Sequence, residues 1–231
     1  MQHNDMSFRL LLAAAILPAL IACQAEQAPA PEYAEEDAAW QGTAGGVLVD
    51  IDRDGFNKLR LQVIDDGIIR VSATPGPDFS NLTDTLMVVA EPAEEGFTVE
   101  QEGQWVAVRT PAASAEVSLE SGAVRFRDAG GRLLLQEAER SLGPVSADPG
   151  EVDGDSYSIR QQFLAGPDEG LYGLGQQQDG RVNYAGENIE LTTYNMEISI
   201  PFLASTQGFG LLWNNTSITR LGDPAPPRPL A

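Results

Sequence analysis

Histidine and cysteine each occur once in the 231 residues of this chain, as His3 and Cys23. Both lie in or beside an N-terminal segment that we expect to be a targeting signal. Beyond Cys23 the chain has no imidazole and no thiol to act as a base, a nucleophile or a metal ligand. The sequence therefore excludes serine–histidine triads, cysteine proteases and histidine-rich metal sites, and we expect neither a metal site nor a disulfide.

Basic residues are scarce as well, with 14 Lys and Arg against 34 Asp and Glu and a formal net charge of −20. A surface of that charge repels phosphate backbones, so we expect no nucleic-acid partner. We interpret the imbalance as the acidic surface of an exported protein.

The N-terminus carries an apolar run over residues 10–22, which suits a secretory signal and is too short to span a bilayer comfortably. The run ends in Leu20-Ile21-Ala22-Cys23, which resembles a bacterial lipobox. We therefore predict a lipoprotein signal peptide over residues 1–22, with Cys23 anchoring the exported protein to a membrane of the periplasm. Gln24 stands where Asp would favour the inner membrane, so it favours the outer membrane. The alternative is an ordinary secretory signal with a chance cysteine.

The next segment, residues 23–45, is rich in Ala, Pro and Glu, and we expect it to be a tether because it cannot bury enough apolar surface to fold. A domain is predicted over residues 46–231. Its first clear signal is the alternation of Leu59, Leu61 and Val63 with polar residues, followed by the turn Asp65-Asp66-Gly67.

Further short strands with turn residues between them recur about every eight to twelve residues, and no segment after residue 23 shows a helical period. This pattern predicts an all-β fold, an antiparallel two-sheet β-sandwich. The further strands are expected at residues 97–101, 104–110, 115–119, 123–128, 133–136 and 158–163.

Three blocks near the C-terminus stand in a specific order: residues 171–176 (LYGLGQ), 200–203 (IPFL) and 208–215 (GFGLLWNN). Together they resemble the N-terminal domain of glycoside hydrolase family 31, which includes α-glucosidases and α-xylosidases. The resemblance implies a galactose-mutarotase-like sandwich without a cofactor. It also implies that two aspartates of a following barrel would cleave terminal α-glycosidic bonds with retention. Residues 176–180 (QQQDG) favour the bacterial α-xylosidase-like branch of the family. The family also contains lyases and transferases, which this domain does not distinguish.

No catalytic residue is carried over by this resemblance. The family's nucleophile motif, an Asp followed shortly by Asn-Glu after a Trp, does not occur in the sequence. Glu187, Glu190 and Glu197 could in principle supply a catalytic pair, but nothing in the sequence brings two of them to the spacing of about 5–5.5 Å that retention needs. We interpret them as solvated strand edges. Without histidine, aldose mutarotase activity is excluded too, so we expect a fragment that stops before the catalytic barrel.

Two other motifs favour structural interpretations. Residues 50–55 (DIDRDG) look like the start of a calcium loop, but the twelfth position is Leu61, which has no carboxylate, so we predict an acidic turn. Gly173-Leu174-Gly175 lacks the third glycine of a dinucleotide fingerprint, and we expect these glycines to let strands cross closely or bend.

The resemblance implies a binding role for the polar loop over residues 176–195, which would reach over the barrel mouth and help to shape the carbohydrate pocket. Sugars present hydroxyl groups and apolar faces, which suit tyrosine, asparagine and aspartate. The alternative is that these side chains only cap loops and pack against the barrel. The substrate-binding candidates are Asp179, Arg181, Asn183, Tyr184, Tyr194 and Asn195.

The sequence thus predicts a non-catalytic N-terminal domain of an exported α-glycosidase, with an α-linked oligosaccharide, a membrane and a catalytic barrel as its partners. The alternative is a free-standing lipoprotein sandwich that binds carbohydrate or serves a structural role. A downstream reading frame that encodes the barrel would decide for the first interpretation.

The lipid anchor is directly testable, because only the thiol of Cys23 would receive the lipid. Metabolic labelling with a palmitate analogue should mark the wild-type protein and leave the Cys23→Ser variant unmarked. Equal labelling of the two proteins would refute the anchor.

Overall fold

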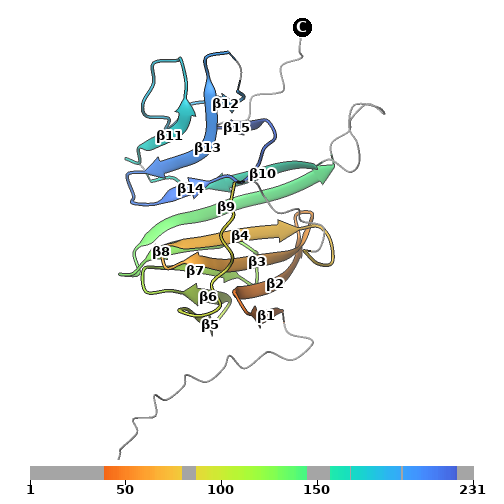
Figure 1. Ribbon diagram of the computed structural model, residues 1–231. Coiled ribbons are helices and arrows are strands. Elements are labelled where there is room, and N and C mark those ends of the chain that lie inside the picture. Colours follow the sequence, from red (N-terminus) through yellow and green to blue (C-terminus); the bar gives the residue numbers. More distant parts are fainter. Residues whose placement is uncertain (1–38, 80–86, 145–156, 167, 194, 223–231) are drawn as a thin grey trace, which may run out of the picture. The chain divides into compact units, whose positions relative to one another are not determined.

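The computed structural model describes residues 39–79, 87–144, 157–166, 168–193 and 195–222, and these contain strands, turns and loops but no helix (Figure 1). Within these ranges there is accordingly no helix that is long and apolar enough to cross a membrane. The strands are β1 (Trp40–Thr43), β2 (Gly46–Arg53), β3 (Phe56–Asp65), β4 (Ile68–Thr74), β5 (Thr98–Glu102), β6 (Trp105–Arg109), β7 (Ala113–Ser118), β8 (Val124–Asp128), β9 (Leu133–Pro144), β10 (Tyr157–Phe163), β11 (Leu171–Gln176), β12 (Ile189–Leu191), β13 (Ile198–Ser205), β14 (Gly210–Leu212) and β15 (Thr219–Leu221).

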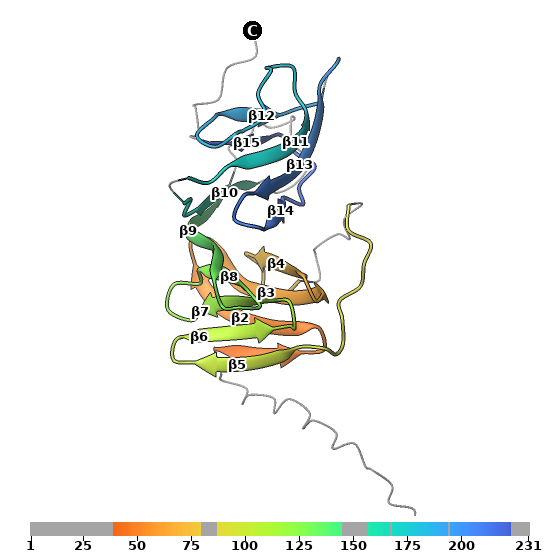
Figure 2. The same ribbon diagram turned by 90° about the vertical axis from the view of Figure 1, so that its left-hand side faces the viewer.

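Most of the strands form two antiparallel sheets, a four-stranded sheet in the order β1-β2-β3-β4 and a six-stranded sheet in the order β10-β9-β8-β7-β6-β5. The two sheets lie one over the other (Figure 2), and side chains of both form one apolar core, which we call the large core. The predicted alternation of β3 is confirmed, and the all-β sandwich with it. The large core consists of Val47, Val49, Leu59, Leu61, Val63, Val106, Val108, Ala115, Val117 and Val124.

Residues 50–55 form the end of β2 and the hairpin turn into β3, in agreement with the predicted turn. Arg53 pairs with Phe56, so Asp54 and Gly55 are the two turn residues, with φ of 57° and 85°. Positive φ at both positions is typical of a type I′ turn, whose twist matches that of the strands. A Cβ on Gly55 would lie 2.5 Å from the carbonyl oxygen of Leu142, whose N–H donates to the Asp54 carbonyl at 3.0 Å. This turn therefore joins the first sheet to β9.

The domain begins earlier than predicted, because the tether was expected to reach residue 45 and the structure places β1 at Trp40–Thr43. All four residues of β1 pair with β2. Trp40 packs against the large core, and its Nε1 donates to Gln101 Oε1 at 2.7 Å. The Ala-, Pro- and Glu-rich composition of residues 23–45 favoured a tether, and it gave no weight to Trp40, which packs against the large core. The predicted signal peptide and Cys23 lie outside the described residues.

Beyond β10 the chain builds two small sheets, of order β11-β13-β14 and β12-β15. They surround a second apolar cluster, which we call the small core. The sequence analysis predicted one sandwich and did not predict this second core. The small core consists of Leu174, Tyr184, Ile189, Leu191 and Leu203.

The Gly173-Leu174-Gly175 run is a β-bulge in the pairing of β11 with β13, which confirms that its glycines serve close strand contact. All three residues have positive φ, which turns the Leu174 side chain into the small core. A Cβ on Gly175 would lie 2.0 Å from the carbonyl oxygen of Ile198. Only glycine fits at this position.

Replacement of Gly175 by Ala should lower the free energy of unfolding by about 2–4 kcal/mol, because the methyl group meets the β13 backbone as well as an unfavourable φ. Gly180→Ala is the matched control, since Gly180 also has positive φ (71°) but has nothing within 4 Å of its Cβ position. It should lose only about 1 kcal/mol. Chemical denaturation of both variants measures the difference, and equal losses would contradict the close-contact explanation.

Candidate functional site

The loop predicted to bind carbohydrate connects β11 to β13 and includes the short strand β12. Backbone hydrogen bonds attach it to the start of β11, where the Tyr184 N–H donates to the Leu171 carbonyl at 2.8 Å. At its other end, β12 pairs with β15 in full register, with Glu190 opposite Arg220. Both attachments hold the loop on the small core.

Asp179, Arg181 and Glu187 form a charged cluster on the surface of the loop. The Asp179 carboxylate accepts the N–H of Arg181 at 3.0 Å, and Arg181 Nη1 donates to Glu187 Oε2 at 2.5 Å. Arg181 Nε lies 4.0 Å from Asp179 Oδ2. The Arg181 side chain remains 46% exposed, so it has donors available to a ligand. The structure thus brings two of the predicted binding residues together.

Two other predicted residues have structural positions instead. Tyr184 is 5% exposed and belongs to the small core, and its hydroxyl donates to the Arg181 carbonyl at 3.3 Å. Burial and the nearby Asp179 carboxylate raise the pKa of the Tyr184 hydroxyl. The Asn183 side-chain oxygen accepts the N–H groups of Leu171 and Ala185, each at 3.0 Å. We therefore remove Tyr184 from the binding candidates and assign Asn183 to holding the loop.

The remaining predictions concern Tyr194 and Asn195. Tyr194 lies outside the described residues. Asn195 is exposed at the turn before β13, with a φ of 51° that asparagine tolerates better than most residues. Among the predicted residues, Asp179, Arg181, Asn183 and Asn195 are exposed, and the side-chain oxygen of Asn183 is already used within the loop.

The acidic residues weighed as a catalytic pair are strand-edge and loop residues. Glu187 pairs with Arg181, and Glu190 Oε2 lies 2.8 Å from Arg220 Nε across the β12–β15 pair. Their counter-ions are half-exposed arginines, as expected for solvated ion pairs. Glu187 and Glu190 therefore each have an arginine as their recorded ion-pair partner.

One face of the β11-β13-β14 sheet is apolar and exposed, which sequence analysis missed. Ile198 and Phe202, which lie on this face, are 53% and 43% exposed. Alternation along β13 directs Leu203 into the small core, so the even-numbered residues point away from it. The register places Leu212 opposite Phe202 and Tyr172 opposite Ala204 on the same face. We call it the outer apolar face, formed by Tyr172, Ile198, Ile200, Phe202 and Leu212.

Comparisons with known proteins agree with the resemblance in the three C-terminal blocks. The family model described as the glycosyl hydrolase 31 N-terminal galactose mutarotase-like domain matches residues 58–221. An uncharacterised family 31 glucosidase of Pseudescherichia vulneris is 30% identical over 179 residues, which cover 69% of this chain and 33% of that protein. An α-xylosidase of Saccharolobus solfataricus is 26% identical over 178 residues, which cover 72% of this chain and 23% of that protein.

Solved structures show the same relationship. The family 31 α-xylosidase of Xanthomonas citri is 41% identical with a TM-score of 0.71, covering 79% of this chain and 20% of that chain. An α-xylosidase from a soil metagenome, complexed with xylose, is 27% identical with a TM-score of 0.67, covering 80% of this chain and 29% of that chain.

This chain is thus much shorter than its relatives, spanning 33% and 23% of the lengths of the two curated ones. The family model nevertheless matches most of it, from β3 to β15. The chain therefore belongs to glycoside hydrolase family 31, and what it contains is the N-terminal galactose mutarotase-like domain.

Proposed function

We propose that this chain is the non-catalytic N-terminal part of an exported α-glycosidase, of α-xylosidase or α-glucosidase type, anchored by a lipid at Cys23. In the complete enzyme it packs on the catalytic barrel and contributes the loop of residues 176–195 to the carbohydrate pocket. The α-xylosidases among its relatives, one of them complexed with xylose, support the choice of reaction. The family's catalytic aspartates would come from the barrel.

The outer apolar face is the observation that carries this proposal. Its five side chains are 39–53% exposed on three adjacent strands. Adjacent apolar side chains of this size mark an interaction surface, whereas scattered ones do not. The loop of residues 176–195 joins two strands of the same sheet, so a barrel docked on this face would lie close to the loop.

The loop then offers polar groups suited to a sugar. Arg181 supplies free N–H donors, Asp179 supplies a carboxylate, and Asn195 supplies an amide that both donates and accepts. The ion pair with Glu187 holds the Arg181 side chain in place before a ligand arrives. Pre-positioned groups of this kind reduce the entropy lost on binding.

The docking of the apolar face can be tested with Ile200→Glu in the complete enzyme and in the 231-residue chain. A charge buried in an interface is strongly unfavourable, so the variant should lose about 2 kcal/mol or more of stability in the complete enzyme. In the chain alone, where Ile200 is 50% exposed, the loss should be within about 0.5 kcal/mol.

Val89→Glu is the control for that comparison, because Val89 is apolar and 89% exposed but lies outside both the outer apolar face and the loop of residues 176–195. It should be neutral in both proteins. Thermal melting measures the changes, and an Ile200→Glu variant that behaves alike in both proteins would favour the free-standing sandwich.

The contribution of the loop can be tested with Asn195→Gly in the complete enzyme, since glycine tolerates the positive φ while the amide is removed. Loss of a substrate hydrogen bond should lower kcat/KM about 5- to 150-fold with unchanged melting. Met196→Ala, at an adjacent residue that is 67% exposed, should leave kcat/KM unchanged. Wild-type kcat/KM in the Asn195→Gly variant would assign the loop to packing alone.

The 231-residue chain by itself should not hydrolyse aryl α-xylosides or α-glucosides. At the loop, Glu187 and Glu190 are each paired with an arginine, and the sequence lacks the family's nucleophile motif. Turnover by the pure chain above the buffer rate would show that an active site had been overlooked.

A further inference from the structure

The small core is less completely covered than the large core. Its side chains are 3–9% exposed, whereas those of the large core are 0–2% exposed. An open groove of about 900 Å³ lies beside it, lined by residues of β10 and of both small sheets. We call it the inter-sheet groove. The residues of the small core that line it are Leu174, Tyr184, Leu191 and Leu203, so whatever fills the groove completes this core.

One wall of the groove is the edge of a sheet. Strand β10 is the last strand of the six-stranded sheet, and all seven of its residues line the groove. Among the described residues, the structure records strand pairing of β10 with β9 alone. The other edge of β10 therefore presents backbone N–H and C=O groups that a further strand can pair with. Leu203 of β13 also lines the groove, whereas Ile200 and Phe202 do not, so the groove is distinct from the outer apolar face.

The side chains of β10 differ from those of β5, which forms the opposite edge of the same sheet. Strand β5 carries Glu100 and Glu102, and charges on an edge strand oppose pairing with another strand. In β10 only Arg160 is charged, and Tyr157 and Ile159 are 44% and 45% exposed. These two residues alternate along the strand, so they lie on one side of it. An exposed apolar edge of this kind is where an added strand binds.

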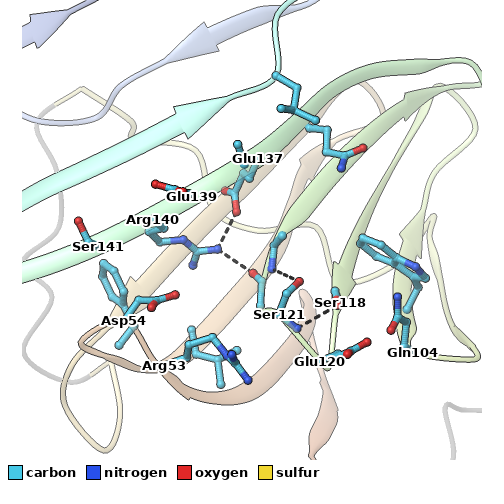
Figure 3. A pocket seen from close by; sticks show the side chains of 18 residues that line it. Arg53, Asp54, Gln104, Ser118, Glu120, Ser121, Glu137, Glu139, Arg140 and Ser141 are labelled. Carbon is cyan, nitrogen blue, oxygen red and sulfur yellow. Dashed lines mark hydrogen bonds and ion pairs between the residues drawn. The ribbon is translucent and has the colours of Figure 1, made fainter. Parts of the chain in front are cut away.

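At the end of the large sandwich, by contrast, polar side chains satisfy the backbone where strand pairing stops (Figure 3). Pairing of β8 with β9 ends before Glu137, whose carboxylate then accepts the Val124 N–H at 2.9 Å. Figure 3 shows Arg140 between Glu137 and the β7–β8 turn, where its Nη2 donates to the Gly122 carbonyl at 2.7 Å. The hydrogen bonds recorded for the described residues include no such side-chain bond to the β10 backbone, so the groove lacks a closure of this kind.

We propose that the inter-sheet groove receives one β-strand from the remaining polypeptide of the complete enzyme. The strand pairs with the free edge of β10 and turns apolar side chains toward the small core. This chain covers only 20–33% of the length of relatives such as the Xanthomonas citri and Pseudescherichia vulneris proteins, so those proteins have ample further polypeptide. That the strand belongs to the same enzyme rests on the proposed function.

Two other occupants fit the groove less well. Residues 223–231 are rich in proline, which cannot donate to a strand ladder. A second copy of this chain would bring its own β10 with the rest of a six-stranded sheet attached to it. A symmetric contact of that kind pairs the two β10 edges but leaves the small core of each copy uncovered.

The test is amide hydrogen exchange, measured by mass spectrometry on the 231-residue chain and on the complete enzyme. Amides of residues 157–163 should exchange at least about 100-fold more slowly in the complete enzyme, because the added strand pairs with them. Strand β5 is the internal control and should exchange alike in both proteins. Ile159→Glu should speed the exchange of residues 157–163 at least about 10-fold in the complete enzyme and leave it unchanged in the chain alone.

Ile68→Glu is the matched control, because Ile68 is 56% exposed and lies outside the groove. It should leave the exchange of β10 unchanged in both proteins. Equal exchange of β10 in the chain and in the complete enzyme would overturn the proposal. If Ile200→Glu still destabilised only the complete enzyme, the proposed function would stand while this inference failed. Protection of β10 that rises with the concentration of the 231-residue chain would assign the groove to a second copy and overturn the proposal as well.

Discussion

The large sandwich depends on aliphatic side chains packed between its two sheets. Val and Leu residues from β2, β3, β6, β7 and β8 are excluded from solvent. Full burial of one such side chain is worth about 1.5–3 kcal/mol. An exposed ion pair such as Arg181–Glu187 is worth about 0–1 kcal/mol, so the core outweighs the surface charges. With a single cysteine in the sequence, no disulfide within the chain shares this role.

Strand β9 connects this core to the rest of the described chain. Its first residues pair with β8, and residues from Glu137 onward pair with β10. Its Leu142 N–H also binds the β2–β3 turn. The end of the sandwich, where β9 leaves β8, is the place where the buried polar pair of Glu137 and Arg140 occurs.

Two buried carboxylates on the six-stranded sheet, those of Glu116 and Glu137, differ in the number of arginines that pair with them. Glu116 is 4% exposed and has ion pairs with Arg109, Arg125 and Arg127, and Arg125 lies 3.7 Å over the Trp105 ring. Glu137 is similarly buried but has one arginine, which retains two unpaired donors. Buried ion pairs offset their own desolvation at best, so neither is a strong source of stability. The first carboxylate has three charged partners, whereas in the second pair Nε and Nη1 of Arg140 are buried without a recorded hydrogen-bond partner.

The sequence by itself determined the all-β class, the hairpin turns, the close strand contact at Gly173 and Gly175, and the family, because each depends on residues within one or two neighbouring strands. Alternation marks strands, and turn residues mark their ends. Only the tertiary structure decided that Tyr184 is buried, that Asn183 binds the distant Leu171 N–H, and that Ile198 and Phe202 face outward. It also decided that Arg140 keeps two donors unpaired. These outcomes depend on which segments meet in space, and the period of two in a strand does not say which of its faces will be covered.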